Sequence, residues 1–151
     1  MATETSGPAF SEDERAAMKE RAREVKATRG KKKPTPEEFA VELLEKIASM
    51  DGPDRVLAEH IHAIVQEHAP ELSPKLWYGM QSYANAAGVS VVFFQDAKKF
   101  KARYATLGFQ ATAALDDGPM WPTSYALTAW TPEVEERVIA LVKRAVSADG
   151  D

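Results

Sequence analysis

Apolar residues recur along this chain at two spacings, and the change of spacing divides it into helical and extended segments. From residue 35 to about residue 69, and again from 131 to 146, apolar side chains repeat every three or four positions, which is typical of amphipathic helices. Between residues 76 and 130, aromatic and β-branched residues form short runs separated by Gly, Asn and Asp, which indicates strands and turns. Helices followed by consecutive strands and a final helix predict an α+β fold.

Capping residues set the limits of the predicted helices. Thr35 and Glu38 form a capping box at the start of the first core helix. Gly52 and Pro53 separate this helix from a second one, and the last helix begins after Thr131. The buried faces predicted for the three helices are Ala40, Leu43, Leu44 and Ile47; Leu57, Ile61, Ile64 and Val65; and Val134, Val138, Leu141, Val142 and Ala145.

The extended region predicts an antiparallel sheet. Strands are expected at 81–85, 89–95, 102–106 and 123–129, with a short helical turn at 110–115. The first two strands flank a turn at 85–88 and should pair as a hairpin, and Pro119 and Pro122 place the last strand at an edge or a bulge. Because short connections favour antiparallel pairing, we predict a two-layer sandwich: one antiparallel sheet with helices packed on a single face.

The first 34 residues are predicted to stand apart from this core. Ser11 and Glu14 form a capping box for an extra N-terminal helix that extends to about Arg29. Its apolar stripe is thin, so it needs a docking partner to be stable. The predicted organisation is a charged helix and basic linker over 1–34, an α+β domain over 35–147 and a frayed tail over 148–151.

Composition limits the classes of function. The chain contains no cysteine, which excludes disulfides, thiolate nucleophiles and cysteine-ligated metals. Its apolar runs are too short to span a membrane and its start lacks an apolar signal core, so a cytoplasmic location is expected. Residues 1–34 hold nine basic against six acidic side chains, whereas the remainder holds ten against seventeen. Because an acidic core disfavours contact with phosphate backbones, nucleic acid is not an expected partner.

Motifs that carry catalysis are absent from the sequence. It has no nucleophile elbow, no phosphate-binding P-loop and no GxGxxG motif. Ser82, Ser90 and Ser124 have no matched histidine nearby in the sequence. We therefore predict a protein that is not an enzyme.

A series of short motifs runs in a characteristic order from Asp54 to Tyr125. They are Asp54-Arg55, Trp77-Tyr78-Gly79-Met80 with Tyr83, Phe93-Phe94-Gln95, Lys98, Phe100-Lys101, Arg103-Tyr104, Thr106-Leu107-Gly108-Phe109 and the run Asp116–Tyr125. In these residues the chain resembles the YdhG-like family, a domain of unknown function. The family often carries proline after the Gly-Met pair, where this chain has Gln81.

The resemblance implies a fold and a role. The implied fold is a secretion-chaperone-like α+β sandwich with about five antiparallel strands. The implied role is the binding or trafficking of intracellular iron, since some relatives resemble frataxin-like iron chaperones. Iron is therefore the cofactor or cargo that the resemblance implies, although it does not name the residues that would hold it.

The candidate metal ligands are histidines and glutamates of the core helices. His60 and His62 are two residues apart and so point to different sides of their helix, while His68 is expected at the edge of the core. Three glutamates of the first core helix lie at i, i+4 and i+7 and can share one side, as oxygen ligands for a hard cation would require. These residues are Glu38, Glu42 and Glu45. The same three also fit an ordinary solvated helix face.

Aromatic and basic residues near glycine and proline predict a ligand pocket. A cavity can open where large rings meet the ends of strands, with cations on its rim to attract an anion. The candidate lining is Trp77, Tyr78, Met80, Tyr83, Lys98, Arg103 and Trp121. Two structural alternatives stay open: most of the aromatics belong to the core, and residues 98–104 form a half-exposed edge strand.

Three functions follow from these observations. The first is a cytoplasmic, non-enzymatic binding or accessory domain of the YdhG-like type, linked to iron. The second is a module that binds a small anionic ligand in an aromatic pocket near Trp77 and Trp121. The third is a protein-interaction module that uses helix 11–29 to contact a partner protein.

Overall fold

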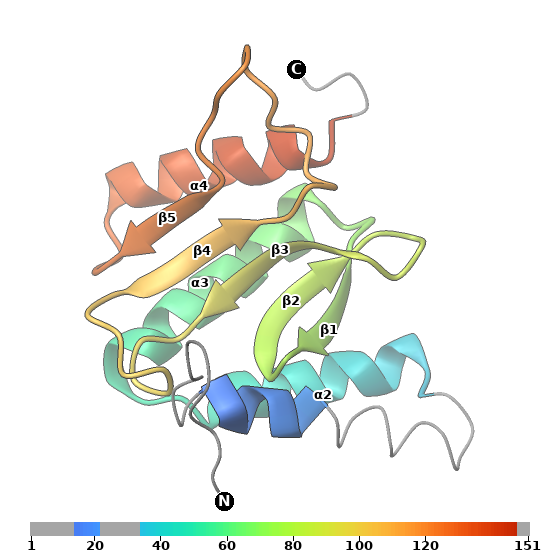
Figure 1. Ribbon diagram of the computed structural model, residues 1–151, viewed down its shortest axis with the longest axis vertical. Coiled ribbons are helices and arrows are strands. Elements are labelled where there is room, and N and C mark those ends of the chain that lie inside the picture. The colour runs from blue at the N-terminus through green and yellow to red at the C-terminus, as the bar shows by residue number, and fades with distance from the viewer. Residues whose placement is uncertain (1–13, 22–33, 148–151) are drawn as a thin grey trace, which may run out of the picture.

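One antiparallel sheet organises the protein. The structure, a computed structural model, describes residues 14–21 and 34–147 (Figure 1). The strands are β1 (Ser73–Trp77), β2 (Met80–Ala84), β3 (Ser90–Gln95), β4 (Ala105–Phe109) and β5 (Ser124–Leu127). Each strand pairs with its neighbour in the sequence, so the order across the sheet is β1-β2-β3-β4-β5.

Three helices of the core pack against this sheet: α2 (Pro36–Ala48), α3 (Gly52–His68) and α4 (Pro132–Ala145). Helix α2 packs along β1, and α3 and α4 lie against each other behind the sheet in the view of Figure 1. The predicted α+β class with an antiparallel sheet is therefore confirmed. None of the helices in 14–21 and 34–147 combines the length and the apolar character that a membrane crossing requires.

Residues 14–21 form a further helical segment, drawn in blue in front of α2 in Figure 1. It corresponds to part of the predicted helix 11–29. The predicted cap at Ser11, the second half of that helix and the tail 148–151 lie outside the described residues.

The caps and the main hairpin form as predicted. The Thr35 hydroxyl accepts the Glu38 amide at 3.2 Å while the Glu38 carboxylate accepts the Thr35 amide at 2.7 Å. Between β2 and β3, the side-chain oxygen of Asn85 accepts the amides of Ala87 and Val89 at 3.0 and 3.1 Å. These local bonds fix where α2 begins and where β2 turns into β3.

The alternation of side chains along the strands gives the sheet a buried face and an uncovered face. Gln81 and Tyr83 point toward α3, since they bond to Ala58 and His62 of that helix. Phe94 is the register partner of Gln81 and is also fully buried. Leu44 is an exception to the predicted helix faces because its side chain is 49% exposed.

Two of the strand predictions were wrong. Strand β1 was missed because Pro74 and the short run around it look unlike a strand, yet an edge strand tolerates a residue without an amide proton. The strand predicted at 102–106 begins instead at Ala105 and ends at Phe109. The segment 110–115 contains a single turn, closed by the bond of the Ala113 amide to the Gln110 carbonyl at 2.9 Å, and no helix. It is held to the core by bonds of the Thr112 hydroxyl to the Ser90 carbonyl and of the Ala114 amide to the Ala145 carbonyl.

Residues 97–104 form a loop, not the predicted edge strand, because of one buried carboxylate. Asp54, in the first turn of α3, accepts the amides of Ala97 at 3.0 Å and Lys98 at 2.9 Å. These amides are then unavailable for strand pairing. The Ala102 amide closes the loop by bonding to the Ala97 carbonyl at 2.9 Å.

Replacing Asp54 by alanine is expected to destabilise the fold by roughly 2–4 kcal/mol, because two hydrogen bonds to a buried carboxylate are lost together. Urea unfolding of the full chain measures the change. Asp51→Ala is the matched control: Asp51 stands three residues earlier and forms an exposed ion pair with Lys98, so its unfolding midpoint should hardly move. Equal losses in the two variants would show that Asp54 does not hold the loop.

Candidate functional site

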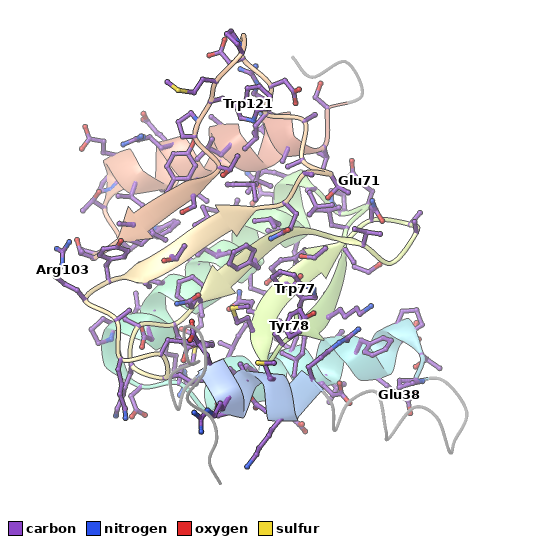
Figure 2. All side chains as sticks on the ribbon, viewed as in Figure 1. Glu38, Glu71, Trp77, Tyr78, Arg103 and Trp121 are labelled. Carbon is purple, nitrogen blue, oxygen red and sulfur yellow. The ribbon has the colours of Figure 1, made fainter. Side chains whose placement is uncertain are left out.

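Aromatic rings gather on the uncovered face of the sheet, at the end formed by β1 to β3. The ring of Trp77 lies 5.3 Å from that of Phe93 and 5.0 Å from that of Tyr78, between centroids, with Trp77 and Tyr78 meeting edge to face. Gly108 on β4 stands opposite Phe93, and a Cβ at Gly108 would collide with the Phe93 ring. The sheet therefore presents an aromatic surface that no core helix covers (Figure 2).

At one end of this face, residues 14–21 cover a pocket of about 300 Å³. Its walls are Glu14, Ala17 and Met18 of the covering segment, with Tyr78, Met80, Gln95 and Phe100 of the domain. Ala17 is buried, and the guanidinium of Arg21 lies 5.7 Å from the centre of the Tyr78 ring. The segment thus finds in its own domain the docking partner that its thin apolar stripe requires.

The turn between β1 and β2 shapes this pocket. Trp77 pairs with Met80, so only Tyr78 and Gly79 make the turn, with φ angles of +52° and +74°. Two positive φ angles are the mark of a type I′ hairpin, whose first position is usually Asn, Asp or Gly. A tyrosine held in this left-handed region costs about 1 kcal/mol, and it brings an aromatic ring to the pocket wall.

Four charged side chains lie near this turn, one from residues 14–21 and three from the domain. Glu20 forms an ion pair with Lys99, whose side chain is only 20% exposed. Burial lowers the pKa of Lys46, in the last turn of α2, while the charge of Asp96 opposes that shift and the charge of Lys99 adds to it. Asp96 itself is 5% exposed, and its Oδ1 has no hydrogen-bond partner among the described residues. We call Glu20, Lys46, Asp96 and Lys99 the charge cluster.

Glycine at position 79 allows the charge cluster to form. The Glu20 carboxylate and the Lys99 ammonium occupy the space that a Cβ at this position would fill, with the Lys99 nitrogen 2.9 Å from it. Close approach of polar groups to the backbone is one of the two reasons for glycine here, and the positive φ angle is the other.

The seven residues predicted to line one pocket lie in separate places. Tyr78 and Met80 line the 300 Å³ pocket, with Trp77 next to them on the sheet. Lys98 and Arg103 line a 440 Å³ pocket at the start of α3, and Trp121 lines a 550 Å³ pocket beside the loop 111–123. Figure 2 shows Trp77 and Tyr78 near the middle of the view, Arg103 at its left and Trp121 at its top. A joint pocket of Trp77, Trp121 and Arg103 is therefore not formed.

The two predicted rim cations have partners of their own. The Lys98 ammonium lies 2.8 Å from the Asp51 carboxylate, which raises the pKa of Lys98 through a hydrogen bond and its charge. The Arg103 guanidinium lies 5.1 Å from the centre of the Tyr104 ring. The cations beside the aromatic pocket are instead Arg21 and Lys99, which lie 5.7 Å from the centres of the Tyr78 and Phe100 rings respectively.

Tyr83, the seventh residue, belongs to the core. Its side chain is fully buried, and burial raises the pKa of its hydroxyl. The hydroxyl accepts from the Gln81 amide at 2.9 Å and also forms a hydrogen bond of 2.9 Å with Nδ1 of His62. Burial lowers the pKa of the His62 imidazole, which favours the neutral ring. Gln81, which stands where the YdhG-like family often has proline, anchors the network to the Ala58 carbonyl.

His62→Gln should reduce the loss of stability on acidification. Because the pKa of folded His62 lies below the ordinary value of about 6.5, the unfolded chain takes up a proton that the folded protein excludes. Stability is therefore full at higher pH and falls as the pH drops through 6.5 toward the folded-state pKa. Urea unfolding between about pH 7.5 and 5.5 tests this. Tyr83→Phe, as control, should lower stability at every pH and keep most of the pH dependence.

The predicted metal ligands do not assemble a site among the residues that the structure describes. Glu38 already gives one oxygen to the cap of α2. The pKa of Glu42 is raised, first by burial and then by the charges of Glu45 and Glu38, so the three are close enough to repel one another. No three histidine or acidic side chains in 14–21 and 34–147 converge closely enough to hold a metal ion. This donor set does not fit a three-ligand iron site, and iron binding stays a prediction of the resemblance.

The histidines diverge as predicted. His60 stacks on Trp130, with ring centroids 4.7 Å apart and planes 3° from parallel. His62 turns instead toward Tyr83 under the sheet. Both therefore have structural partners on different sides of α3.

Sequence reasoning missed the charge cluster entirely. Its members and Gly79 come from four separate stretches of the chain, so no local spacing links them all. One signal was present: Lys46 lies on the same side of α2 as Leu43 and Ile47, both buried. A lysine within a buried stripe indicates a buried counter-charge or a ligand.

Comparisons with protein-family models, curated proteins and solved structures find no match to this chain. The class of protein is therefore defined by the fold and the site: an α+β domain whose antiparallel sheet keeps an uncovered aromatic face. Resemblance to the YdhG-like family remains a prediction.

Gly79→Ala is expected to detach residues 14–21 from the sheet. Alanine at a positive φ angle costs about 1 kcal/mol wherever it occurs, and at Gly79 it also displaces Glu20 from Lys99. Hydrogen exchange should therefore quicken at residues 14–21. Gly88→Ala is the matched control, because Gly88 has a φ of +81° and open space around it. Protection of 14–21 that is equal in both variants would contradict this role for Gly79.

Proposed function

We propose that this protein is a non-enzymatic, cytoplasmic binding domain of the YdhG-like type that holds a small, partly apolar molecule on the uncovered face of its sheet. The site is the pocket between residues 14–21 and the walls Tyr78, Met80 and Phe100. This is the second of the three functions that the sequence left open, the binding of a small molecule. The binding site now proposed lies at the β1–β2 turn instead of between Trp77 and Trp121.

The observation that carries the proposal is the conformation of Tyr78. A tyrosine occupies the first position of a type I′ turn, where its left-handed backbone is unfavourable. Tyr78 is 40% exposed, and its ring lies against Trp77 and Arg21 while the rest of its surface is open to a ligand. Residues held in unfavourable backbone conformations cluster at binding and active sites, so this strain supports a ligand at the β1–β2 turn.

The surroundings of Tyr78 support an apolar ligand with a polar end. Met80 and Phe100 offer apolar surface, and Gln95 offers an amide, on segments that are themselves fixed by the sheet and by Asp54. Such a mixture of apolar walls and few polar groups is typical of small-molecule sites. Iron handling, the other role implied by the resemblance, finds no comparable set of ligands in residues 14–21 and 34–147.

Phe100→Ala is expected to weaken binding of an aromatic probe by roughly 10–30-fold, because about 2 kcal/mol of apolar contact is lost. Suitable probes are 3-phenyllactate and its uncharged counterpart 3-phenyllactamide, titrated into the full chain and followed by amide NMR shifts. Binding should move the amides of Tyr78, Gly79 and Gln95.

Phe39→Ala provides the matched control, since Phe39 is a half-buried ring of α2 outside the pocket. It should bind both probes as the wild type does. The proposal fails when neither probe moves the amides of the pocket, or when Phe100→Ala and Phe39→Ala weaken binding equally.

A further inference from the structure

The pocket beside the β1–β2 turn is small, and Gln95 brings a side-chain amide to it. Its volume of about 300 Å³ is at the lower end of the range for small-molecule sites, so it suits a single ring with a short polar end. Tyr78 and Phe100 offer their own rings to such a ring, while Gln95 reaches the pocket from β3. The nature of the polar end therefore depends on what the Gln95 amide can bind.

The backbone of Gln95 is fixed on both sides. Gln95 is the last residue of β3, a strand paired with β2 and β4, and its register partner on β4 is Thr106. The chain that follows is held by the bonds of Ala97 and Lys98 to Asp54. Side chains on such a rigid element are well placed for recognition, because the backbone needs no rearrangement when a ligand binds.

The side-chain amide of Gln95 is not used inside the part of the protein that the structure describes. It forms no hydrogen bond with residues 14–21 or 34–147, although the side chain is half-buried. On the buried face, by contrast, the Gln81 amide nitrogen donates to the Ala58 carbonyl and the Tyr83 hydroxyl. Gln95 thus keeps both a donor and an acceptor for a ligand.

A primary carboxamide is the group that matches a glutamine side chain. Each carries an N–H donor and a C=O acceptor side by side, so the two groups can join through two hydrogen bonds. A carboxylate offers only acceptors and sets one of its oxygens against the Gln95 carbonyl oxygen. A trans peptide bond holds its N–H and C=O on opposite sides, so it can form only one of the two bonds.

The charges around the pocket also favour a neutral end over an acid. Among the described walls none is a cation, and the charged one is Glu14. Lys99, whose ammonium lies 5.7 Å from the centre of the Phe100 ring, already has Glu20 as its carboxylate partner. An acid in the pocket therefore finds no unpaired cation among these residues.

We infer that Gln95 determines the specificity of the pocket, and that the ligand is a small molecule with a primary carboxamide beside a single apolar ring. Two hydrogen bonds join the carboxamide to Gln95 while the ring lies against Tyr78 and Phe100. The inference rests on the binding function proposed above and names the class of its ligand.

The test titrates the full chain with three molecules that share one body: 3-phenyllactamide, 3-phenyllactate and N-methyl-3-phenyllactamide. The wild type should bind the primary amide about tenfold more tightly than either of the others, which is the discrimination that a good bidentate pair provides. The N-methyl amide is the sharper comparison, because it is uncharged and lacks only the donor beside its carbonyl.

Two variants of Gln95 test its role. Gln95→Glu replaces a donor by an acceptor at nearly unchanged shape, so it should weaken binding of 3-phenyllactamide about tenfold. It should instead prefer 2-hydroxy-3-phenylpropanamidine, whose two donors match a carboxylate. Gln95→Leu should bind 3-phenyllactamide and its N-methyl counterpart equally.

Gln110→Leu is the matched control, since Gln110 is also half-buried but lines the separate 550 Å³ pocket. It should keep the wild-type preference for the primary amide. Loss of this preference in Gln95→Leu together with its retention in Gln110→Leu supports the inference.

The remaining outcomes separate the inference from the function on which it rests. When neither 3-phenyllactate nor 3-phenyllactamide binds the wild type, the binding function itself is wrong and the inference fails with it. When both bind and Phe100→Ala weakens them, but the primary amide has no advantage or Gln95→Leu retains that advantage, the pocket binds ligands and the carboxamide assignment is wrong.

Discussion

The site depends on two hydrogen bonds that the Asp54 carboxylate accepts from the backbone amides of Ala97 and Lys98. They join the start of α3 to a loop more than forty residues later in the chain. Without it, residues 97–104 could extend as a strand, and Asp96, Lys99 and Phe100 would no longer share one end of the sheet. A single carboxylate thus positions both a wall of the pocket and half of the charge cluster.

The two faces of the sheet differ in what covers them. On the buried face, the Gln81 side-chain amide nitrogen donates to the Tyr83 hydroxyl and to the Ala58 carbonyl, whereas the Gln81 side-chain oxygen has no hydrogen-bond partner among the described residues. On the uncovered face, the hydroxyls of Ser82 and Ser90 bond to each other. Unmatched polar atoms therefore do not mark either face, and what distinguishes the uncovered face is Tyr78, held at a positive φ angle at the β1–β2 turn.

Much of the fold could be predicted from the sequence, because it depends on local signals. The caps at Thr35 and Thr131 and the turn at Asn85 are decided within a few residues, and the structure confirms them. Strand β1 was missed although its hairpin with β2 is local, because Pro74 and a tyrosine in the two-residue turn are unusual for a hairpin. The true start of β4 depends on distant residues, namely on the bonds of Ala97 and Lys98 to Asp54. The candidate site was harder to predict than the fold. Tyr78 and Met80 could be picked out because they flank Gly79 in the sequence, whereas Lys46, Asp96 and Lys99 have no such local signal.

The two edge strands of the sheet limit how a strand of another chain could pair with it. One edge strand, β1, contains Pro74, which has no amide proton to offer, and the other, β5, spans only four residues. Addition of a strand from another chain is therefore unfavourable at both sides. Self-association through sheet extension is discouraged in the same way, so the uncovered face can stay open to solvent without seeding fibrils.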